Sequence, residues 1–313
     1  MEHTNAINCP ICKKTETSYY MSTNALMHEP NNELYVFDLC NNCETVFLTN
    51  PVVPEILEEY YTENYLPYRG SLAWGKYFSF VENSQKNLDL KRVNFVKKYL
   101  KKNEPNLSVL DVGCGNPSFL ELLQQNSKVN CTGIDFSDSG WKGKNYPNLE
   151  LKKVSIEDYD TKTKTEFDVI TLWHYLEHDY NPYQTIETLY NCLKQGGKII
   201  IEIPNYKSVS AKIQKSYWQG WHSPRHLSLL TNKGFALLFP KDKWDIKKHL
   251  QYGTLDAFTL WWLGRMEKKG IDWSGNMSNN FWMLVLLKVI TSPIFVFEKL
   301  FPLGVQILVV EKK

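Results

Sequence analysis

Four cysteines near the start of the chain form two Cys-x-x-Cys pairs, Cys9 with Cys12 and Cys40 with Cys43. A two-residue spacer lets both thiolates of a pair approach one metal ion, and two pairs give the tetrahedral four-thiolate coordination that zinc prefers. Because four thiolates leave no open coordination position, the predicted zinc is structural rather than catalytic. Two unrelated pairs of free thiols are the alternative interpretation. A dithiol redox site is disfavoured, since no βαβ pattern surrounds either pair.

The residues around these cysteines predict a small zinc ribbon. Residues 34–37 and 45–48 are strand-like and flank the second pair, while residues 27–33 are polar, contain Pro30 and predict a loop. The metal would stabilise a module too small to bury a sufficient apolar core. We therefore predict a zinc-ribbon module over residues 1–50. A helical connector or lid follows over residues 51–105, in which residues 74–102 carry apolar side chains at helical spacing.

A predicted strand, a glycine loop and a predicted helix follow one another over residues 108–125. Gly113 and Gly115 frame Cys114 in the loop. The glycines permit a tight turn and let a ligand approach the backbone, while the helix N-terminus offers free N–H groups. The third glycine of the dinucleotide fingerprint is absent, because residues 116–118 are Asn-Pro-Ser. This difference disfavours a nicotinamide cofactor.

Three more predicted strands follow. Asp135 ends the first of them, about 20 residues after the glycine loop, where a carboxylate can accept both hydroxyls of an adenosine ribose. Residues 151–155 lead into Ile156 and Glu157, a position suited to the edge of an adenine ring. Residues 167–172 lead into Trp173 and His174, and a predicted helix over residues 183–193 precedes the strand at residues 198–205. Alternating strands and helices predict an α/β fold with a parallel sheet.

Together these segments resemble the class I S-adenosylmethionine-dependent methyltransferases. The matching motifs are Leu110-Asp111-Val112-Gly113-Cys114-Gly115, Gly133-Ile134-Asp135, Phe167-Asp168-Val169-Ile170, Leu176-Glu177-His178 and Lys194-Gln195-Gly196-Gly197. They cover about a third of the chain in the family's order. The resemblance implies a Rossmann-like fold over residues 106–313, with a seven-stranded, mainly parallel sheet, helices on both faces and S-adenosyl-L-methionine as the cofactor. Variable insertions would occupy residues 206–300.

The resemblance also implies cofactor-binding roles. The methionine end and the backbone side of the cofactor would contact Asp111, Gly113, Cys114 and Gly115. The ribose would contact Asp135 and the adjoining Phe136, and the adenine would be bordered by Ile156 and Glu157. Trp173 and His174 would lie beside the sulfonium. One departure is Pro117, where the family usually has a small residue. Proline removes one N–H donor but suits the first turn of a helix, so we expect cofactor binding to survive.

The methyl acceptor is predicted to bind within the aromatic-rich residues 217–227. His226 and His222 are candidate general bases, and His174 is a third catalytic candidate. Arg225 is a candidate clamp for an acceptor phosphate or carboxylate, and the candidate substrate-binding aromatic residues are Trp218 and Trp221. The alternative is that residues 224–226 form a packed loop that orients a helix at residues 231–239. His174 and His178 could share a metal ion on one helix face, but the sequence supplies no evident third ligand.

The acceptor itself is not determined by these residues. Relatives that pair a four-cysteine ribbon with this domain often act on sugars, polysaccharides or secondary metabolites. The resemblance therefore implies a small molecule such as a saccharide, a nucleotide-sugar or a lipid-linked glycan. One alternative is an RNA or protein methyltransferase that binds its substrate through the ribbon, and another is a non-catalytic binding protein. The net charge of +2, without a block of like charges, gives no clear nucleic-acid signature.

An apolar segment at residues 281–297 contains a single charge, Lys288, and is interrupted by Pro293. It would pack on the domain as a helix ahead of a final strand at residues 305–310, or lie in a membrane interface through residues 281–300. A true transmembrane span is the least favoured interpretation. The N-terminus lacks the pattern of a secretory signal, which predicts a cytoplasmic protein with reduced cysteines, with association at the inner face of the membrane as an open alternative.

Overall fold

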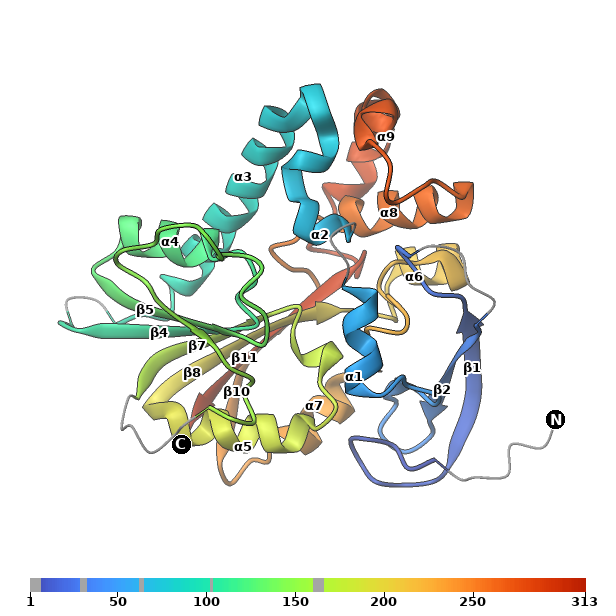
Figure 1. Ribbon diagram of the computed structural model, residues 1–313. Helices are drawn as coiled ribbons and strands as arrows, with labels where there is room; N and C mark the ends of the chain where they lie inside the picture. Colours follow the sequence, from blue (N-terminus) through green and yellow to red (C-terminus); the bar gives the residue numbers. More distant parts are fainter. Residues whose placement is uncertain (1–6, 29–32, 62–64, 102–103, 160–165) are drawn as a thin grey trace.

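The computed structural model describes residues 7–28, 33–61, 65–101, 104–159 and 166–313. Two sheets organise these residues (Figure 1). The larger has seven strands in the order β10-β11-β8-β7-β4-β5-β6, and the smaller has four in the order β1-β2-β3-β9. The predicted combination of a seven-stranded α/β domain with a small four-cysteine module is confirmed.

The seven-stranded sheet is mainly parallel, and its strands are β4 (Leu107–Val112), β5 (Val129–Asp135), β6 (Glu150–Lys153), β7 (Phe167–Trp173), β8 (Leu193–Pro204), β10 (Trp244–Leu250) and β11 (Val305–Lys312). The exception is β11, which lies between β8 and β10 and is antiparallel to both. β4 lies between β5 and β7, so the strand order reverses beside its carboxyl end. Ligands of open α/β sheets bind at such a switch point.

Helices cover both faces of this sheet (Figure 1). On one face lie α3 (Phe78–Val96) and α4 (Ser118–Asn126), and on the other α5 (Pro182–Cys192) and α7 (Asn232–Leu238). Neighbouring strand residues point to opposite faces. Accordingly, Ile200 packs in the cluster of α3 and α4, while Ile199 packs in the cluster of α5 and α7. Burial on both faces explains why every residue of β7 is buried.

The smaller sheet joins the N-terminal ribbon to a distant segment. Its strands are β1 (Thr17–Thr23), β2 (Tyr35–Cys40), β3 (Val46–Leu48) and β9 (Ser228–Leu229). β9 pairs with β3 in antiparallel register, with Val46 opposite Leu229. Because β9 begins two residues after His226, this pairing holds the segment that contains His226 next to the ribbon.

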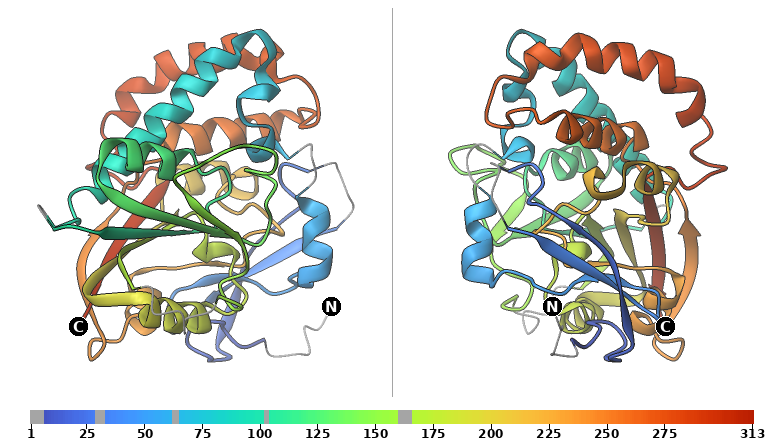
Figure 2. Two further views of the ribbon diagram at one scale, coloured as in Figure 1. Left: turned by 60° about the vertical axis from the view of Figure 1, so that its left-hand side comes forward. Right: turned by 90° about the vertical axis from the view of Figure 1, so that its right-hand side faces the viewer.

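A helical cap lies at one end of the molecule (Figure 2). It contains α2 (Leu66–Arg69), the 3₁₀ helix η2 (Gly70–Tyr77), α3, α8 (Ala257–Lys269), the 3₁₀ helix η6 (Met277–Asn280) and α9 (Phe281–Phe295). The helix expected at residues 74–102 is shorter, because Gly75 has φ 48° and interrupts it before α3. Shorter elements are α1 (Pro54–Leu57), η1 (Glu58–Tyr60), η4 (Leu176–His178), α6 (Val209–Gln214) and η5 (Lys215–Tyr217). Within the described ranges, no helix has the length and apolar character needed to cross a membrane.

Candidate active site

The glycine loop connects β4 to α4 at the switch point of the sheet. Gly113 and Gly115 have φ of 70° and 48°, a left-handed conformation that favours glycine. A Cβ at Gly113 would lie 2.5 Å from Cδ2 of Tyr175, whereas a Cβ at Gly115 would meet nothing within 4 Å. The Cα side of Gly115 is therefore free for a ligand to approach, while its carbonyl oxygen packs closely against Gly140.

Asp135, at the end of β5, is tied to this loop. Its Oδ2 accepts a hydrogen bond from the Gly115 N–H (2.9 Å), and its Oδ1 accepts one from the Ser137 N–H (2.9 Å). A carboxylate has about four acceptor positions, so both oxygens retain capacity for ribose hydroxyls. Burial raises the pKa of Asp135. The neighbouring Phe136 is half exposed and contacts the Tyr61 ring, with centroids 5.9 Å apart.

Asp111 and Trp173 lie deeper in the same region. Asp111 is buried, and its Oδ1 accepts a hydrogen bond from the Thr171 hydroxyl (2.6 Å). Burial raises the pKa of Asp111 to about 7, although the hydrogen bond from Thr171 opposes this shift. Trp173 packs edge-on against Phe119, and its Nε1 is buried without a hydrogen-bond partner in the described part of the chain. Both side chains lie at the carboxyl ends of adjacent strands, Asp111 on β4 and Trp173 on β7.

The predicted cofactor residues thus gather at the carboxyl ends of adjacent strands. Cys114 is buried in the cluster of α3 and α4, and Ile156 is buried beyond β6, where Glu157 is exposed. The free space beside Cα of Gly115 and the remaining acceptor capacity of Asp135 fit an adenosyl cofactor. When bound, S-adenosylmethionine would supply an electrophilic methyl group there.

His174 is held between two buried carboxylates. Its Nδ1 lies 3.2 Å from Oε1 of Glu177, and its Nε2 lies 3.1 Å from Oε1 of Glu202. Burial disfavours the charged ring, but the hydrogen bonds to Glu177 and Glu202 prevail and raise the pKa of His174 to about 9. Both ring nitrogens are engaged by carboxylates, so the charged His174 has no free lone pair with which to act as the catalytic base considered among the sequence candidates.

Three other histidines form a cluster next to Glu177. The His226 ring centroid lies 4.5 Å from that of His178 and 5.1 Å from that of His222. His226 Nδ1 lies 2.8 Å from the Gly220 carbonyl oxygen, and its Nε2 lies 3.9 Å from Oε1 of Glu177. Burial lowers the pKa of each of the three rings, so all three are neutral near pH 7.

Tyrosines from the connector surround this cluster. The Tyr65 hydroxyl lies 2.8 Å from Nε2 of His222, and the Tyr61 hydroxyl lies 3.1 Å from Nδ1 of His178. The Tyr68 ring packs edge-on against Tyr65, with centroids 5.2 Å apart. Sequence reasoning assigned these tyrosines to a lid and gave them no role in the site. The high density of tyrosine at residues 60–68 is the feature of the sequence that could have indicated their presence near the site.

Arg225 is fully buried and binds the chain itself. Its Nε and Nη2 both donate to the Tyr60 carbonyl oxygen (3.0 and 2.6 Å), and its Nη1 donates to the Leu26 carbonyl oxygen (2.9 Å). Its guanidinium also lies 4.5 Å from the centroid of the Tyr65 ring. Arg225 therefore holds the connector and the ribbon against the histidines, and its donors are not free for the acceptor clamp anticipated from the sequence.

Trp218 and Trp221 are also buried. They pack edge-on at 5.3 Å, and the Trp221 ring contacts Phe37 of β2 at 5.3 Å. Both belong to the core cluster between the ribbon and α6. With 0% and 1% of their surface exposed, neither side chain presents a surface to an acceptor, in contrast to the substrate-binding role anticipated from the sequence.

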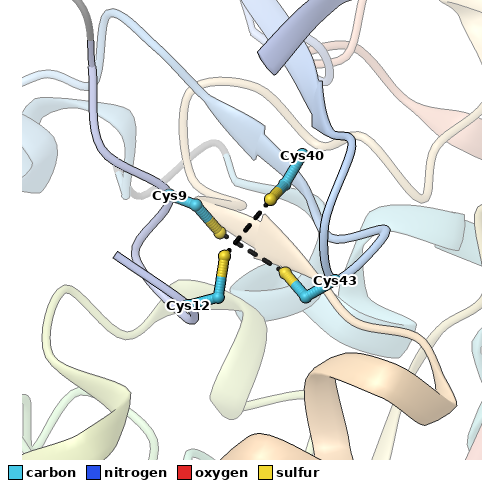
Figure 3. Close-up of side chains that lie close together, drawn as sticks. All are labelled: Cys9, Cys12, Cys40 and Cys43. Atoms are coloured by element: carbon cyan, nitrogen blue, oxygen red, sulfur yellow. Dashed lines mark hydrogen bonds between the residues drawn. The ribbon is translucent and has the colours of Figure 1, made fainter. Parts of the chain in front are cut away.

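The four cysteines converge at the base of the ribbon (Figure 3). Cys9 Sγ lies 3.6 Å from Cys43 Sγ, Cys12 Sγ lies 3.3 Å from Cys40 Sγ, and all four sulfurs lie within 4.8 Å of one another. A tetrahedral site with Zn–S bonds of about 2.3 Å separates its sulfurs by about 3.8 Å. The cluster is therefore compatible with one structural zinc ion.

Ligand atoms of Glu177, His178 and His226 also lie within 4.8 Å of one another. The His174–His178 pair considered from sequence is not this group, because His174 bonds to the two carboxylates. Arg225 and the charged His174 both act electrostatically on His226. The charged His174 already pairs with Glu177, so this group has little net negative charge with which to attract a cation.

Comparisons with known proteins identify the family. Residues 84–242, about half of the chain, match the family described as "Methyltransferase domain", and the chain belongs to that family. The ubiquinone biosynthesis O-methyltransferase of Coxiella burnetii is 32% identical over 179 residues, which are 48% of this chain and 76% of that protein. The protein is accordingly an S-adenosylmethionine-dependent methyltransferase, as the sequence motifs predicted.

Other similarities are more limited. The ubiquinone biosynthesis O-methyltransferase of Saccharophagus degradans is 31% identical over 120 residues, which are 36% of this chain and 50% of that protein. The chain thus spans half the length of this curated relative. Among solved structures, the cyclopropane synthase MmaA2 from Mycobacterium tuberculosis aligns at 13% identity with a TM-score of 0.48, covering 72% of this chain and 84% of that one.

Replacing Asp135 by alanine is expected to weaken binding of S-adenosylmethionine about tenfold to a hundredfold, because the ribose loses a charged acceptor. Titration calorimetry would measure the dissociation constant, and circular dichroism would confirm folding. Asp245→Ala, on the exposed edge of β10, is the matched control and should bind normally. An unchanged dissociation constant in Asp135→Ala would contradict the assigned ribose site.

Proposed function

We propose that this methyltransferase transfers a methyl group to a hydroxyl oxygen of a small-molecule acceptor, with His226 accepting the hydroxyl proton. In this step an oxygen–carbon bond forms, the sulfur–carbon bond of the donor breaks, and its electron pair stays on sulfur. The proton moves from the acceptor oxygen to Nε2 of His226 and then to solvent. The observation that carries the proposal is the orientation of the His226 ring.

The hydrogen bond to the Gly220 carbonyl requires a proton on Nδ1 of His226, so the neutral ring has its lone pair on Nε2. Burial lowers the pKa of His226 and keeps that nitrogen unprotonated near neutral pH. Glu177 lies beside it, and Oε2 of Glu177 is buried without a hydrogen-bond partner among the residues described. That carboxylate would stabilise the imidazolium formed when His226 takes a proton.

His226 suits this role better than the other two histidines of the cluster. Nε2 of His222 is engaged by the Tyr65 hydroxyl and lies 3.3 Å from Nη1 of Arg225. Nδ1 of His178 lies 3.1 Å from both the Tyr61 hydroxyl and the Arg225 carbonyl oxygen. We infer that these two histidines orient the tyrosines, which would hold the acceptor in line with the donor and exclude water.

A hydroxylated aromatic ring is the acceptor class that we favour. Tyr68 is 39% exposed and offers an apolar ring with a polar hydroxyl tip, against which such an acceptor ring can pack, whereas the Tyr65 ring is buried beneath Arg225. The names of the two relatives refer to O-methylation in ubiquinone biosynthesis, which supports a small-molecule oxygen acceptor. The saccharide and glycan acceptors anticipated by resemblance have no counterpart in these names. Peripheral membrane contact through residues 281–300 would suit acceptors that carry an apolar tail.

Transfer from S-adenosylmethionine with a tritiated methyl group would test the acceptor class. The purified chain would be incubated with hydroxylated phenols, with nucleotide-sugars and with bulk RNA in parallel. We expect label in a phenol fraction, together with one S-adenosylhomocysteine per methyl transferred. Label confined to the sugars or to RNA would overturn the proposed acceptor class, and donor binding without transfer to any acceptor would favour the non-catalytic alternative.

The lowered pKa of His226 predicts an unusual pH dependence. A base works only when unprotonated, so kcat should fall as the pH falls through the pKa of the group. Because burial lowers that pKa below the ordinary histidine value near 6.5, kcat should hold to a pH below 6.5. A stopped assay at saturating substrates would measure this profile. A drop centred at 6.5 or above would contradict a buried histidine base.

A further inference from the structure

The outer surface of the helical cap is apolar and uncovered. α9 turns one stripe of large side chains outward, and the residues after it continue the stripe: Trp282, Leu286, Val289, Ile290, Ile294, Val296, Phe297, Leu300 and Phe301 are all more than half exposed. We call this set the α9 surface. In the right-hand view of Figure 2, α9 runs along the outer edge of the molecule. Contiguous exposed apolar surface of this kind marks an interaction site.

The opposite face of α9 packs against the rest of the helical cap. Phe281 is buried and stacks on Tyr77, with ring centroids 3.7 Å apart. Phe295 packs edge-on against Phe258 of α8. Lys288, the single charge of the helix, pairs with Asp256 at the start of α8 (3.1 Å). The helix is therefore docked on the protein through one face, and its one charge is neutralised by that contact.

Basic side chains border the α9 surface at both ends. At the start of α9, Lys269 reaches Sδ of Met283 (3.9 Å), and Lys76 lies over the Tyr77 ring, which itself contacts Trp282. At the far end, Lys91 and Lys299 lie near Glu298, whose acidic charge offsets one of theirs, while Asp256 is paired with Lys288. An apolar strip with tryptophan at one end and lysines around it matches an interfacial membrane helix.

We propose that the α9 surface docks in the plane of a bilayer that contains anionic phospholipids. With 15 residues, α9 is about 22 Å long, too short for a hydrocarbon core of about 30 Å, so it would lie parallel to the membrane. The bordering lysines complement anionic headgroups. A second copy of the chain seated on this surface across a two-fold axis would instead bring these lysine borders together.

Sedimentation with lipid vesicles tests the proposal without reference to the methyl acceptor. The wild-type chain is expected to pellet with vesicles of phosphatidylglycerol and phosphatidylcholine, and to pellet less with phosphatidylcholine alone or at high salt. Binding should shift the tryptophan emission of the wild-type chain to shorter wavelength, and this shift should be smaller in Trp282→Phe. The paired variant Leu286→Glu with Ile290→Glu should bind vesicles more than about tenfold more weakly, because two inserted apolar side chains are replaced by charges.

A matched control makes the same changes elsewhere. Leu237→Glu with Ile246→Glu alters exposed leucine and isoleucine on α7 and β10, away from the α9 surface, and should bind vesicles as wild type does. Both paired variants should keep wild-type melting temperature and affinity for S-adenosylmethionine. Equal vesicle binding by the two paired variants would overturn the proposal. So would wild-type dimers that depend on Leu286 and Ile290 and do not bind vesicles.

Discussion

Replacing Cys40 by serine is expected to release about one equivalent of zinc, destabilise the ribbon and abolish most methyl transfer. Structural zinc contributes roughly 10 kcal/mol to the folding of small zinc modules, and the described part of the ribbon has a limited core of its own. The metal site is also joined to the segment that contains the proposed base. Thr231 donates to the Cys43 carbonyl oxygen (3.1 Å), and Tyr206 donates to the Glu44 carbonyl oxygen (2.6 Å).

The route from the metal to the proposed base is short. β3 follows the second cysteine pair and pairs with β9, which begins two residues after His226. Loss of the ribbon should therefore free the His226 loop as well as the N-terminal strands. Metal analysis, thermal melting and kcat would be measured on Cys40→Ser and on chelator-treated wild type. Cys192→Ser, a buried cysteine of α5 outside the cluster, should keep the metal. Full activity after complete metal removal would contradict this coupling.

Replacing His226 by glutamine is expected to lower kcat about 10²- to 10⁴-fold, the usual contribution of a general base. The affinity for S-adenosylmethionine should stay within about twofold, because the predicted cofactor residues lie at the carboxyl ends of β4 to β7, whereas His226 contacts Gly220 and Glu177. His249→Gln, on β10, provides a matched control, since His249 bonds to Gln306 away from the site.

The pH profile distinguishes a base from a structural residue. Wild-type kcat should fall at low pH, whereas the residual kcat of His226→Gln should lose that dependence. A variant with unchanged kcat would contradict the role of His226. A loss of activity matched by an equal loss of cofactor affinity, with the low-pH fall retained, would instead indicate a packing role.

The donor half of the molecule could be predicted from sequence because its signals are local. The loop at Gly113 to Gly115 follows a strand and precedes a helix, and Asp135 ends the adjacent strand, so neighbouring motifs determine neighbouring geometry. The cysteine pairs are equally informative, because metal ligation specifies residue type and spacing. In both cases the chemistry requires particular side chains at fixed separations along the chain.

The acceptor side could not be predicted in the same way. β9 is two residues long and pairs with a strand about 180 residues earlier, so no periodic pattern reveals it. Arg225 is a residue type suited to clamping an anion, yet its partners are backbone carbonyls of distant segments. The same holds for Tyr61 and Tyr65, which reach the histidines only through tertiary packing. Such contacts depend on how the ribbon, connector and sheet assemble.

Titration calorimetry of the wild-type chain with S-adenosylmethionine tests most directly whether the carboxyl ends of β4, β5 and β7 form the donor site. We expect saturable binding of one molecule per chain, with S-adenosylhomocysteine competing for the same site. The absence of saturable binding at millimolar cofactor, in protein that melts cooperatively and retains its zinc, would contradict that assignment.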